Sequence, residues 1–225
     1  MSASPGKSVR MFDLEFVGRM AFHAWPHSPH TMVFSRITPG TNALDIGCSV
    51  GHFARELKKI SCKVWGMDVD AQAAREAAQY CEEVVVADFD TLQSLPFANI
   101  SFDVVLLLDV LEHLARPDRF LPLVADRLGP HGTVWISLPN VARIEHRWNL
   151  LLGRFDYQDG SALSKGHLRF FTQKTARQLI AESGLRIVSE QGTGFASILK
   201  SKGVPMFPIL HRLTAYQFLF ECDNR

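Results

Sequence analysis

Short apolar stretches alternate with amphipathic ones through most of the chain. The apolar stretches predict strands at 43–46, 63–67, 84–87, 103–108 and 133–138. The stretch at 103–108 is apolar at nearly every position, which is typical of a parallel strand covered on both faces. Between the first two strands, Phe53 and Leu57 are four residues apart, the spacing of one helix face. This alternation predicts a parallel sheet with helices on both sides.

The intervening segments carry helix signals. Helices are expected at 52–59, 71–80, 118–128, 141–152 and 173–183. Pro117 suits a helix first turn, whereas Pro122 inside the same helix predicts a kink or a late start. The residues at 129–132 (GPHG) predict a turn before the fifth strand. Thr172 is a good N-cap and Gly184 a good C-terminal stop for the last of these helices.

Two more strands are expected at 185–190 and 216–222, which completes one doubly wound α/β sheet of seven strands. Residues 1–40 form a lead-in that we expect to be helical and to cap the substrate. Residues 41–225 form the main domain. Within it, residues 141–171 are expected to be a lid-like insertion, polar and turn-rich at 153–166.

Composition narrows the class of protein. The chain has 225 residues, 47% of them apolar, enough for one packed domain. Its net charge of +1 gives no reason to expect nucleic acid as a partner. The N-terminus lacks the apolar region of a signal peptide, and no apolar run reaches about 18 residues, so no membrane span is expected. Four scattered cysteines without CxxC spacing predict free thiols and a cytoplasmic protein.

The turn after the first strand carries a glycine pattern. It reads Asp45-x-Gly47-x-x-x-Gly51. A dinucleotide fingerprint needs GxGxxG, but Ser49 and His52 occupy the second and third glycine positions. The turn therefore argues against a nicotinamide oxidoreductase. The acid beside the turn suits a cationic ligand better than an anionic one.

Acids also end the next two strands. Asp68 follows the second strand, about 20 residues beyond the turn, where a ribose-hydroxyl acceptor is expected. Asp88 ends the third strand, with Phe89 beside it and Asp90 as a competing acid. The set predicts a ligand that has a ribose and a base.

Together these motifs resemble those of the class I S-adenosylmethionine-dependent methyltransferases. LDIGCSVGHF resembles their first motif, with Ser49 in place of its middle glycine. WGMDVD, VADFD, FDVVLLLDVLEHL and LGPHGTVWISLPN resemble the motifs at the following strands. The stretch from SLPNVARIEHRW to GHLRFFT resembles small bacterial methyltransferases near the ubiquinone-biosynthesis O-methyltransferases and MetW-like proteins. The resemblance implies a Rossmann-like fold and S-adenosylmethionine as the methyl donor, with S-adenosylhomocysteine as product.

The resemblance also implies roles for single residues. Asp68 would bind both ribose hydroxyls, Asp88 would accept from the adenine amino group, and Phe89 would stack on the ring or contact its edge. Asp109 would face the amino group or the substrate side. The residues expected to bind the cofactor are Asp45, Gly47, Cys48, Gly51, Asp68, Val69, Asp88, Phe89 and Asp109. For Cys48 we expect packing and a backbone role, because no base lies beside it in the sequence.

Two histidines are candidate catalytic bases. His113 lies just after the fourth strand, near the expected methyl group, and a packing role is the alternative. His167 follows the lid and could be brought over the pocket with Arg169; a structural link between lid and sheet is the alternative. Asn140 either orients substrate or ends the fifth strand as a turn residue.

Other chemistry-bearing residues carry weaker signals. His23, His27 and His30 stand among prolines without an acid cluster, so no metal site is expected. The stretch 148–152 (WNLLL) is expected to be a buried amphipathic helix; an exposed, substrate-gripping face is the alternative.

The sequence therefore predicts an S-adenosylmethionine-dependent methyltransferase that acts on a small or lipid-like acceptor, with oxygen as the expected acceptor atom. A non-catalytic module that binds the same cofactor is the alternative, and Ser49 is its best support. The apolar residues near the lid hint at an acceptor with a hydrophobic part. A homodimer is left open.

Overall fold

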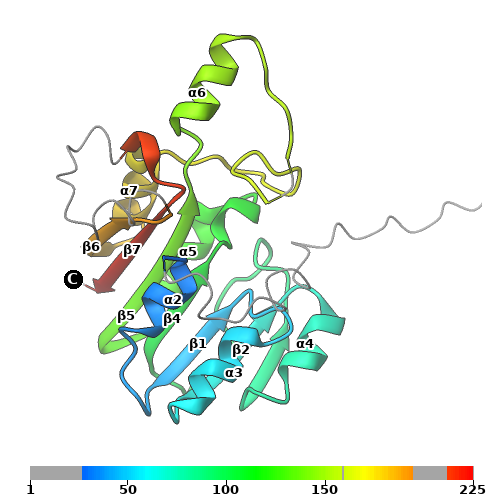
Figure 1. Cartoon of the computed structure of the whole chain (residues 1–225). Coiled ribbons are helices and arrows are strands. Elements are labelled where there is room, and N and C mark those ends of the chain that lie inside the picture. The colour runs from blue at the N-terminus through cyan, green and yellow to red at the C-terminus, as the bar shows by residue number, and fades with distance from the viewer. Residues whose placement is uncertain (1–26, 159, 195–211, 225) are drawn as a thin grey trace, which may run out of the picture.

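The computed structural model describes residues 27–158, 160–194 and 212–224, so most of the expected lead-in, including His23, lies outside the described residues. Its centre is a seven-stranded sheet in the order β3-β2-β1-β4-β5-β7-β6 (Figure 1). The strands are β1 Asn42–Ile46, β2 Lys63–Asp68, β3 Glu83–Val86, β4 Phe102–Leu108, β5 Leu128–Pro139, β6 Leu185–Gly192 and β7 Gln217–Asn224. Strands β1 to β5 pair in parallel, and β7 runs antiparallel to both β5 and β6.

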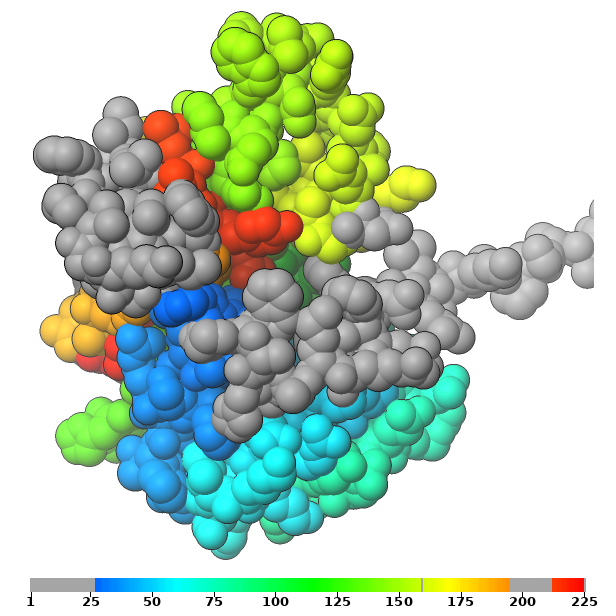
Figure 2. All heavy atoms as spheres, viewed as in Figure 1, coloured from blue at the N-terminus to red at the C-terminus, as the bar shows by residue number. Residues whose placement is uncertain are grey.

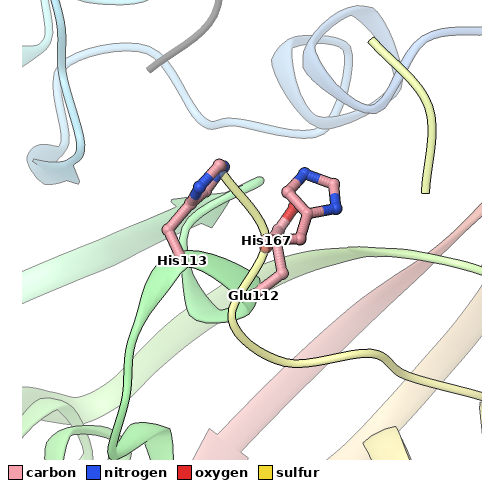
Figure 3. Close-up of side chains that lie close together, drawn as sticks. All are labelled: Glu112, His113 and His167. Carbon is pink, nitrogen blue, oxygen red and sulfur yellow. The ribbon is translucent and has the colours of Figure 1, made fainter. Parts of the chain in front are cut away.

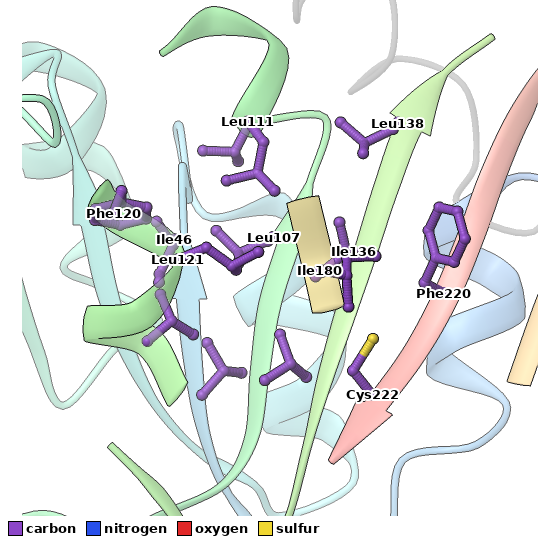
Figure 4. Close-up of a cluster of buried hydrophobic side chains, with 14 of the residues drawn as sticks. Ile46, Leu107, Leu111, Phe120, Leu121, Ile136, Leu138, Ile180, Phe220 and Cys222 are labelled. Atoms are coloured by element: carbon purple, nitrogen blue, oxygen red, sulfur yellow. The ribbon is translucent and has the colours of Figure 1, made fainter. Parts of the chain in front are cut away.

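Helices cover both faces of this sheet. They are α2 Pro29–Phe34, α3 His52–Lys59, α4 Ala71–Ala77, the 3-10 helix η2 Leu111–His113, α5 Pro117–Ala125, α6 Ile144–Leu151 and α7 Gln173–Glu182. On one face, Phe120 of α5 and Ile180 of α7 belong to the same apolar cluster as Leu107 and Ile136 of the sheet (Figure 4). On the other face, α2 and α3 pack against Leu106 and its neighbours. The predicted doubly wound, mostly parallel sheet is confirmed.

Two local predictions were wrong. Residues 129–132 do not form a turn before the strand but lie within β5, where they form a bulge between the Phe102–Leu128 and Val104–Thr133 pairs. Glycine is needed there for close packing, because a Cβ at Gly132 would lie 2.8 Å from the Phe102 carbonyl oxygen. Pro122 was expected to cause a kink or a late start of its helix, and the late start is wrong, since α5 begins at Pro117.

The ends of α7 follow the sequence signals. The Thr172 hydroxyl accepts a hydrogen bond from the backbone amide of Thr175, which closes a capping box. Gly184 follows the helix with a φ of +88°, in the left-handed region that favours glycine. Both predicted helix ends are confirmed. Within the described ranges, the chain has no helix long and apolar enough to cross a membrane.

Candidate active site

The turn between β1 and α3 needs glycine at two positions. Gly47 has a φ of +75°, and a Cβ there would lie 2.8 Å from Cγ2 of Val110. Gly51 has a φ of +80°, and a Cβ there would lie 2.9 Å from the Ala77 Cα. Ser49 also lies in the left-handed region, at a φ of +49°, although it carries a side chain. The turn therefore keeps its left-handed path without the middle glycine.

The end of β2 holds this turn in place. The backbone amides of Gly47 and Cys48 both donate to the Met67 carbonyl oxygen, at 2.8 and 3.0 Å. The amide of Ser49 donates to Oδ2 of Asp68 at 2.7 Å, and the amide of Asp70 donates to its Oδ1 at 2.8 Å. The Asp68 side chain is only 3% exposed, yet each oxygen keeps capacity for a further hydrogen bond.

Two buried carboxyl groups give the turn a negative environment. Burial, together with the nearby charge of Asp68, raises the pKa of Asp45 to about 7. Burial also raises the pKa of Asp68, and the backbone amides of Asp70 and Ser49 oppose that rise. A positively charged ligand at the turn would be attracted by both groups.

Cys48 is a packing residue of this turn. Its side chain is buried, and a Cβ added at Gly66 would lie 2.9 Å from its sulfur. Burial, with the nearby charge of Asp45, raises the pKa of the Cys48 thiol, so the reactive thiolate is suppressed. This agrees with the expected packing role. All four cysteines are free, as predicted.

The acids after β3 divide into two roles. Asp90 accepts hydrogen bonds from the backbone amides of Ala115 and Arg116, at 2.9 and 2.8 Å, and so joins this loop to the start of α5. Asp88 is exposed, and its carboxylate accepts a hydrogen bond from the Asp90 amide at 3.0 Å. Asp88 is therefore the acid available to a ligand at the end of β3, and Val69 exposes its side chain at the end of β2.

Phe89 lies in the core at the end of β3. Its ring is 5% exposed and stacks on Phe120, with ring centroids 5.3 Å apart and planes at 25°. Both rings belong to the core between the sheet and α5. One face of the ring is therefore used by a core contact, and the contact of Phe89 with the edge of adenine stays a prediction.

Asp109 follows β4 and is fixed by two neighbouring strands. Its φ of +59° is unusual for a residue with a side chain. Its Oδ1 accepts hydrogen bonds from the Ser137 hydroxyl of β5 and the Gln217 amide of β7, each at 2.7 Å. The Asp109 amide donates in turn to the Ser137 oxygen at 2.9 Å. The backbone strain is thus balanced by contacts that hold the carboxylate at the carboxyl end of β4.

Beside Asp109, the short helix η2 brings Glu112 and His113 next to His167 (Figure 3). The rings of His113 and His167 lie 4.8 Å apart between centroids, edge to face. The backbone amides of Leu168 and Arg169 donate to the Glu112 carbonyl oxygen, at 2.8 and 2.9 Å. The two predicted catalytic histidines, 54 residues apart in the chain, therefore meet at one place.

Burial controls the protonation of His113, His167 and Glu112. It lowers the pKa of both His113 and His167, which favours the neutral imidazole. The nearby carbonyl oxygens of Gly166 and Ala162 oppose this shift. Burial, together with the charge of Asp109, raises the pKa of Glu112 well above its usual range.

Two further candidates have structural roles. Asn140 is fully buried, and its side chain bonds the carbonyls of Arg212 and Ala215 and the amide of Ala142. The alternative that it orients substrate is therefore wrong. The Arg169 guanidinium bonds the Ala115 carbonyl oxygen, so this residue joins the end of the 141–171 segment to the segment before α5.

The segment 141–171 leaves the sheet after β5 and carries α6 away from it (Figures 1 and 2). Helix α6 has no buried residue, with Trp148 60% and Leu151 74% exposed. The expectation of a buried helix at 148–152 is wrong, because no other described element packs over these side chains. The exposed apolar face was the alternative.

Sequence reasoning missed three contributors to the site. Ser137 and Gln217 hold Asp109 through tertiary contacts that local patterns do not encode. Glu112 did carry a signal, because it is an acid within the apolar stretch LDVLEHL and precedes a histidine.

A sequence comparison matches residues 18–190 to a family described as "Methyltransferase domain". Among curated relatives, the ubiquinone biosynthesis O-methyltransferase of Parvibaculum lavamentivorans is 26% identical over 155 residues, which cover 68% of this chain and 61% of that protein. The corresponding protein of Bartonella bacilliformis is 27% identical over 160 residues, or 68% of this chain and 63% of that protein. The chain thus spans less than two thirds of either relative.

Solved structures show the same fold. A TehB-like S-adenosylmethionine-dependent methyltransferase from Corynebacterium glutamicum superposes with a TM-score of 0.61 at 16% identity, over 94% of this chain and 92% of that one. Magnesium protoporphyrin IX methyltransferase from Synechocystis, solved with S-adenosylhomocysteine, gives a TM-score of 0.58 at 17% identity, over 88% and 80%. This chain therefore belongs to the methyltransferase domain family, and its fold is that of S-adenosylmethionine-dependent methyltransferases.

Proposed function

We propose that the chain transfers the methyl group of S-adenosylmethionine to a hydroxyl oxygen of a small acceptor with an apolar part. The observation that carries the proposal is the pairing of His113 and His167 beside Asp109, at the carboxyl end of β4. Open α/β sheets bind their ligands at this end of the strands. The glycine turn and Asp68 end neighbouring strands at the same edge.

On the cofactor side, the proposal assigns the turn at Gly47, Cys48 and Gly51 to the methionine half. Asp68 accepts from the ribose hydroxyls and Asp88 from the adenine amino group, with Val69 against the base. The charges of Asp45 and Asp68 favour a ligand that carries a sulfonium and an ammonium group.

On the acceptor side, a hydroxyl nucleophile must lose a proton during transfer. His113 and His167 each direct Nδ1 to a backbone carbonyl oxygen, so Nδ1 carries the hydrogen and Nε2 keeps a lone pair. Either Nε2 can therefore receive the hydroxyl proton. Asp109 lies near both rings, and its charge stabilises the imidazolium that forms.

Bound S-adenosylmethionine supplies the methyl group on a sulfonium, a good leaving group. The protein's task is to align the acceptor oxygen with the carbon–sulfur bond and to exclude water. The proton that leaves the oxygen as the new carbon–oxygen bond forms goes to Nε2 of a histidine.

The exposed side chains of α6 support an acceptor with an apolar part. Trp148 and Leu151 lie on the segment that also carries His167, and we assign the apolar part of the acceptor to this exposed surface. The names of the O-methyltransferase relatives support oxygen as the acceptor atom, at 26–27% identity.

Two measurements test the proposal. Calorimetry should detect S-adenosylhomocysteine binding to the folded protein; absence of binding would contradict the cofactor assignment. Mass spectrometry should then detect methylated product and S-adenosylhomocysteine with phenols and alcohols that carry apolar groups. Transfer only to amine or thiol analogues would contradict O-methylation. Binding without turnover on a broad panel would favour a non-catalytic module.

Variants of the two histidines locate the base. His167→Asn or His113→Asn should lower kcat by about 100-fold or more while S-adenosylhomocysteine affinity stays within about twofold. His131→Asn, at an exposed histidine in the bulge of β5, is the matched control and should leave kcat unchanged.

A further inference from the structure

We propose that Glu112, His113 and His167 bind one divalent first-row transition-metal ion. One side-chain donor atom from each residue lies within 4.8 Å of the other two. Figure 3 shows that η2 supplies Glu112 and His113, whereas the end of the 141–171 segment supplies His167. Among the described residues, this is the one group of histidine, cysteine and acidic side chains with such geometry.

The carboxyl group of Glu112 is the first argument. Its residue is 1% exposed, and neither carboxyl oxygen has a hydrogen-bond partner in the described part of the chain. A buried carboxylate without a partner is costly, and protonation would leave the new hydroxyl and the carbonyl oxygen equally unsatisfied. A bound metal ion would give the Glu112 carboxylate a direct partner. Neither the ionised nor the protonated carboxyl group has such a partner within the described part of the chain.

The orientation of the imidazoles is the second argument. Nδ1 of His113 lies 3.0 Å from the Gly166 carbonyl oxygen, and Nδ1 of His167 lies 3.0 Å from that of Ala162. Because a carbonyl only accepts, both rings carry their hydrogen on Nδ1 and present Nε2 as the ligand atom. Metal-bound histidines in proteins usually have such an outer hydrogen bond to a carbonyl or carboxylate.

The size of the site fits an ion after a small adjustment. Two donors that each bind an ion at about 2.1 Å lie at most about 4.2 Å apart. The widest pair in this group therefore has to close by roughly half an ångström, which a small side-chain rotation provides. Two imidazole nitrogens and one carboxylate oxygen suit zinc, iron(II), cobalt(II) or manganese(II), and they leave coordination positions open for a ligand.

The two ligand-bearing segments are already joined. The amides of Leu168 and Arg169 bond the Glu112 carbonyl oxygen, directly beside His167. This backbone link fixes the distance between the halves of the site before an ion binds, which reduces the entropic cost of binding.

The inference does not depend on methyl transfer, and it departs from the expectation that the chain holds no metal. An ion would occupy both Nε2 lone pairs, so a histidine cannot be ligand and proton acceptor at once. With an ion bound, an acceptor hydroxyl would coordinate it and lose its proton to solvent more easily.

Cobalt(II) tests the site by direct binding. The full chain, freed of purification tags and stripped of metal with a chelator, is titrated with cobalt(II) while the visible absorption bands of the ion are recorded. We expect saturation at one ion per chain, displacement by zinc(II), and a higher Tm on metal addition. Glu112→Gln and His167→Ala should each weaken binding by about 100-fold, whereas the matched control His131→Ala should bind like the wild type.

Circular dichroism of the metal-free variants verifies that they are folded; Glu112→Gln keeps the size of the side chain. The proposal is overturned if the wild type shows no saturable cobalt(II) bands. It is equally overturned if Glu112→Gln and His167→Ala, both folded, bind as tightly as the wild type, because the ion would then sit elsewhere.

Discussion

The Asp68 carboxylate accepts a hydrogen bond from the Ser49 backbone amide at 2.7 Å, so the end of β2 is joined directly to the glycine turn after β1. One side chain therefore both shapes the turn and faces the proposed ribose. Asp68→Ala should lower the affinity for S-adenosylhomocysteine by about 100-fold or more, because hydrogen bonds to a charged group contribute about 1.5–3 kcal/mol each. Isothermal titration calorimetry measures this change.

Asp103→Ala is the matched control for that variant. Its carboxylate also accepts a backbone amide, that of Asn42 at 2.8 Å, but at the opposite end of the strands. The control should bind the ligand like the wild type. Equal affinities for Asp68→Ala and Asp103→Ala would contradict the ribose assignment.

Asp88 and Asp90 should separate binding from stability. Asp90→Ala removes the acceptor of two backbone amides and should lower the free energy of unfolding by about 2 kcal/mol. Asp88→Ala should change stability by less than about 1 kcal/mol and weaken S-adenosylhomocysteine binding roughly tenfold. Urea unfolding and calorimetry measure the two effects. The reverse pattern would assign the adenine contact to Asp90.

Asp45 should make the stability of the ligand-free protein depend on pH. Its pKa is raised from 3.8 in the unfolded chain to about 7 in the folded protein, so the folded state holds the proton more tightly. The resulting stability is fully present below pH 4 and is lost as the pH rises to 7. Asp45→Asn, which does not ionise, should therefore gain a few kcal/mol relative to the wild type between pH 4 and pH 8. Parallel pH profiles from urea unfolding would contradict the raised pKa.

The apolar side chains of α6 should contribute to acceptor binding and should not contribute to cofactor binding. The double variant Trp148→Ser with Leu151→Ser should raise the acceptor KM roughly tenfold, because it removes apolar contact area, and leave S-adenosylhomocysteine affinity unchanged. Steady-state kinetics measures KM. Val188→Ser, at an exposed apolar residue of β6, is the control. An unchanged KM in the double variant would exclude α6 from acceptor binding.

Gly47 and Gly153 form a pair that separates packing from backbone strain. Both have a positive φ, +75° and +71°, but a Cβ meets Val110 at Gly47 and nothing within 4 Å at Gly153. Gly153→Ala should cost about 1 kcal/mol of unfolding free energy, and Gly47→Ala about 2–4 kcal/mol. Chemical unfolding curves provide both values. Equal costs would mean that Val110 moves aside freely.

The arrangement of the sheet could be predicted because each buried strand is marked by its own apolar residues and each turn by its own glycines. The predictions that failed concern features that depend on contacts between residues distant in sequence. The pair Gly129 and Gly132 was interpreted as a turn, but these glycines allow close approach to Ser101 and Phe102. The apolar residues of α6 predicted burial, but periodicity does not tell whether a partner element exists.

The predictions for the candidate site divide in the same way between local features and distant contacts. Strand-end acids were found because the end of a strand is a local feature. The separate roles of Asp88 and Asp90 depend on the start of α5, and the position of Phe89 depends on Phe120. Glu112 was overlooked because one acid among apolar residues is informative only once its burial is known.

The segment 141–171 begins and ends at neighbouring points, because Asn140 and Phe171 form a bridge and the Val141 amide bonds the Phe171 carbonyl oxygen at 3.0 Å. Residues between these points can lengthen, shorten or change without altering the register of any strand. Exchange of this segment, in evolution or by engineering, can therefore change the substrate that is accepted. The glycine turn and the acids at the ends of β2 and β3, which are proposed to bind the methyl donor, would remain in place.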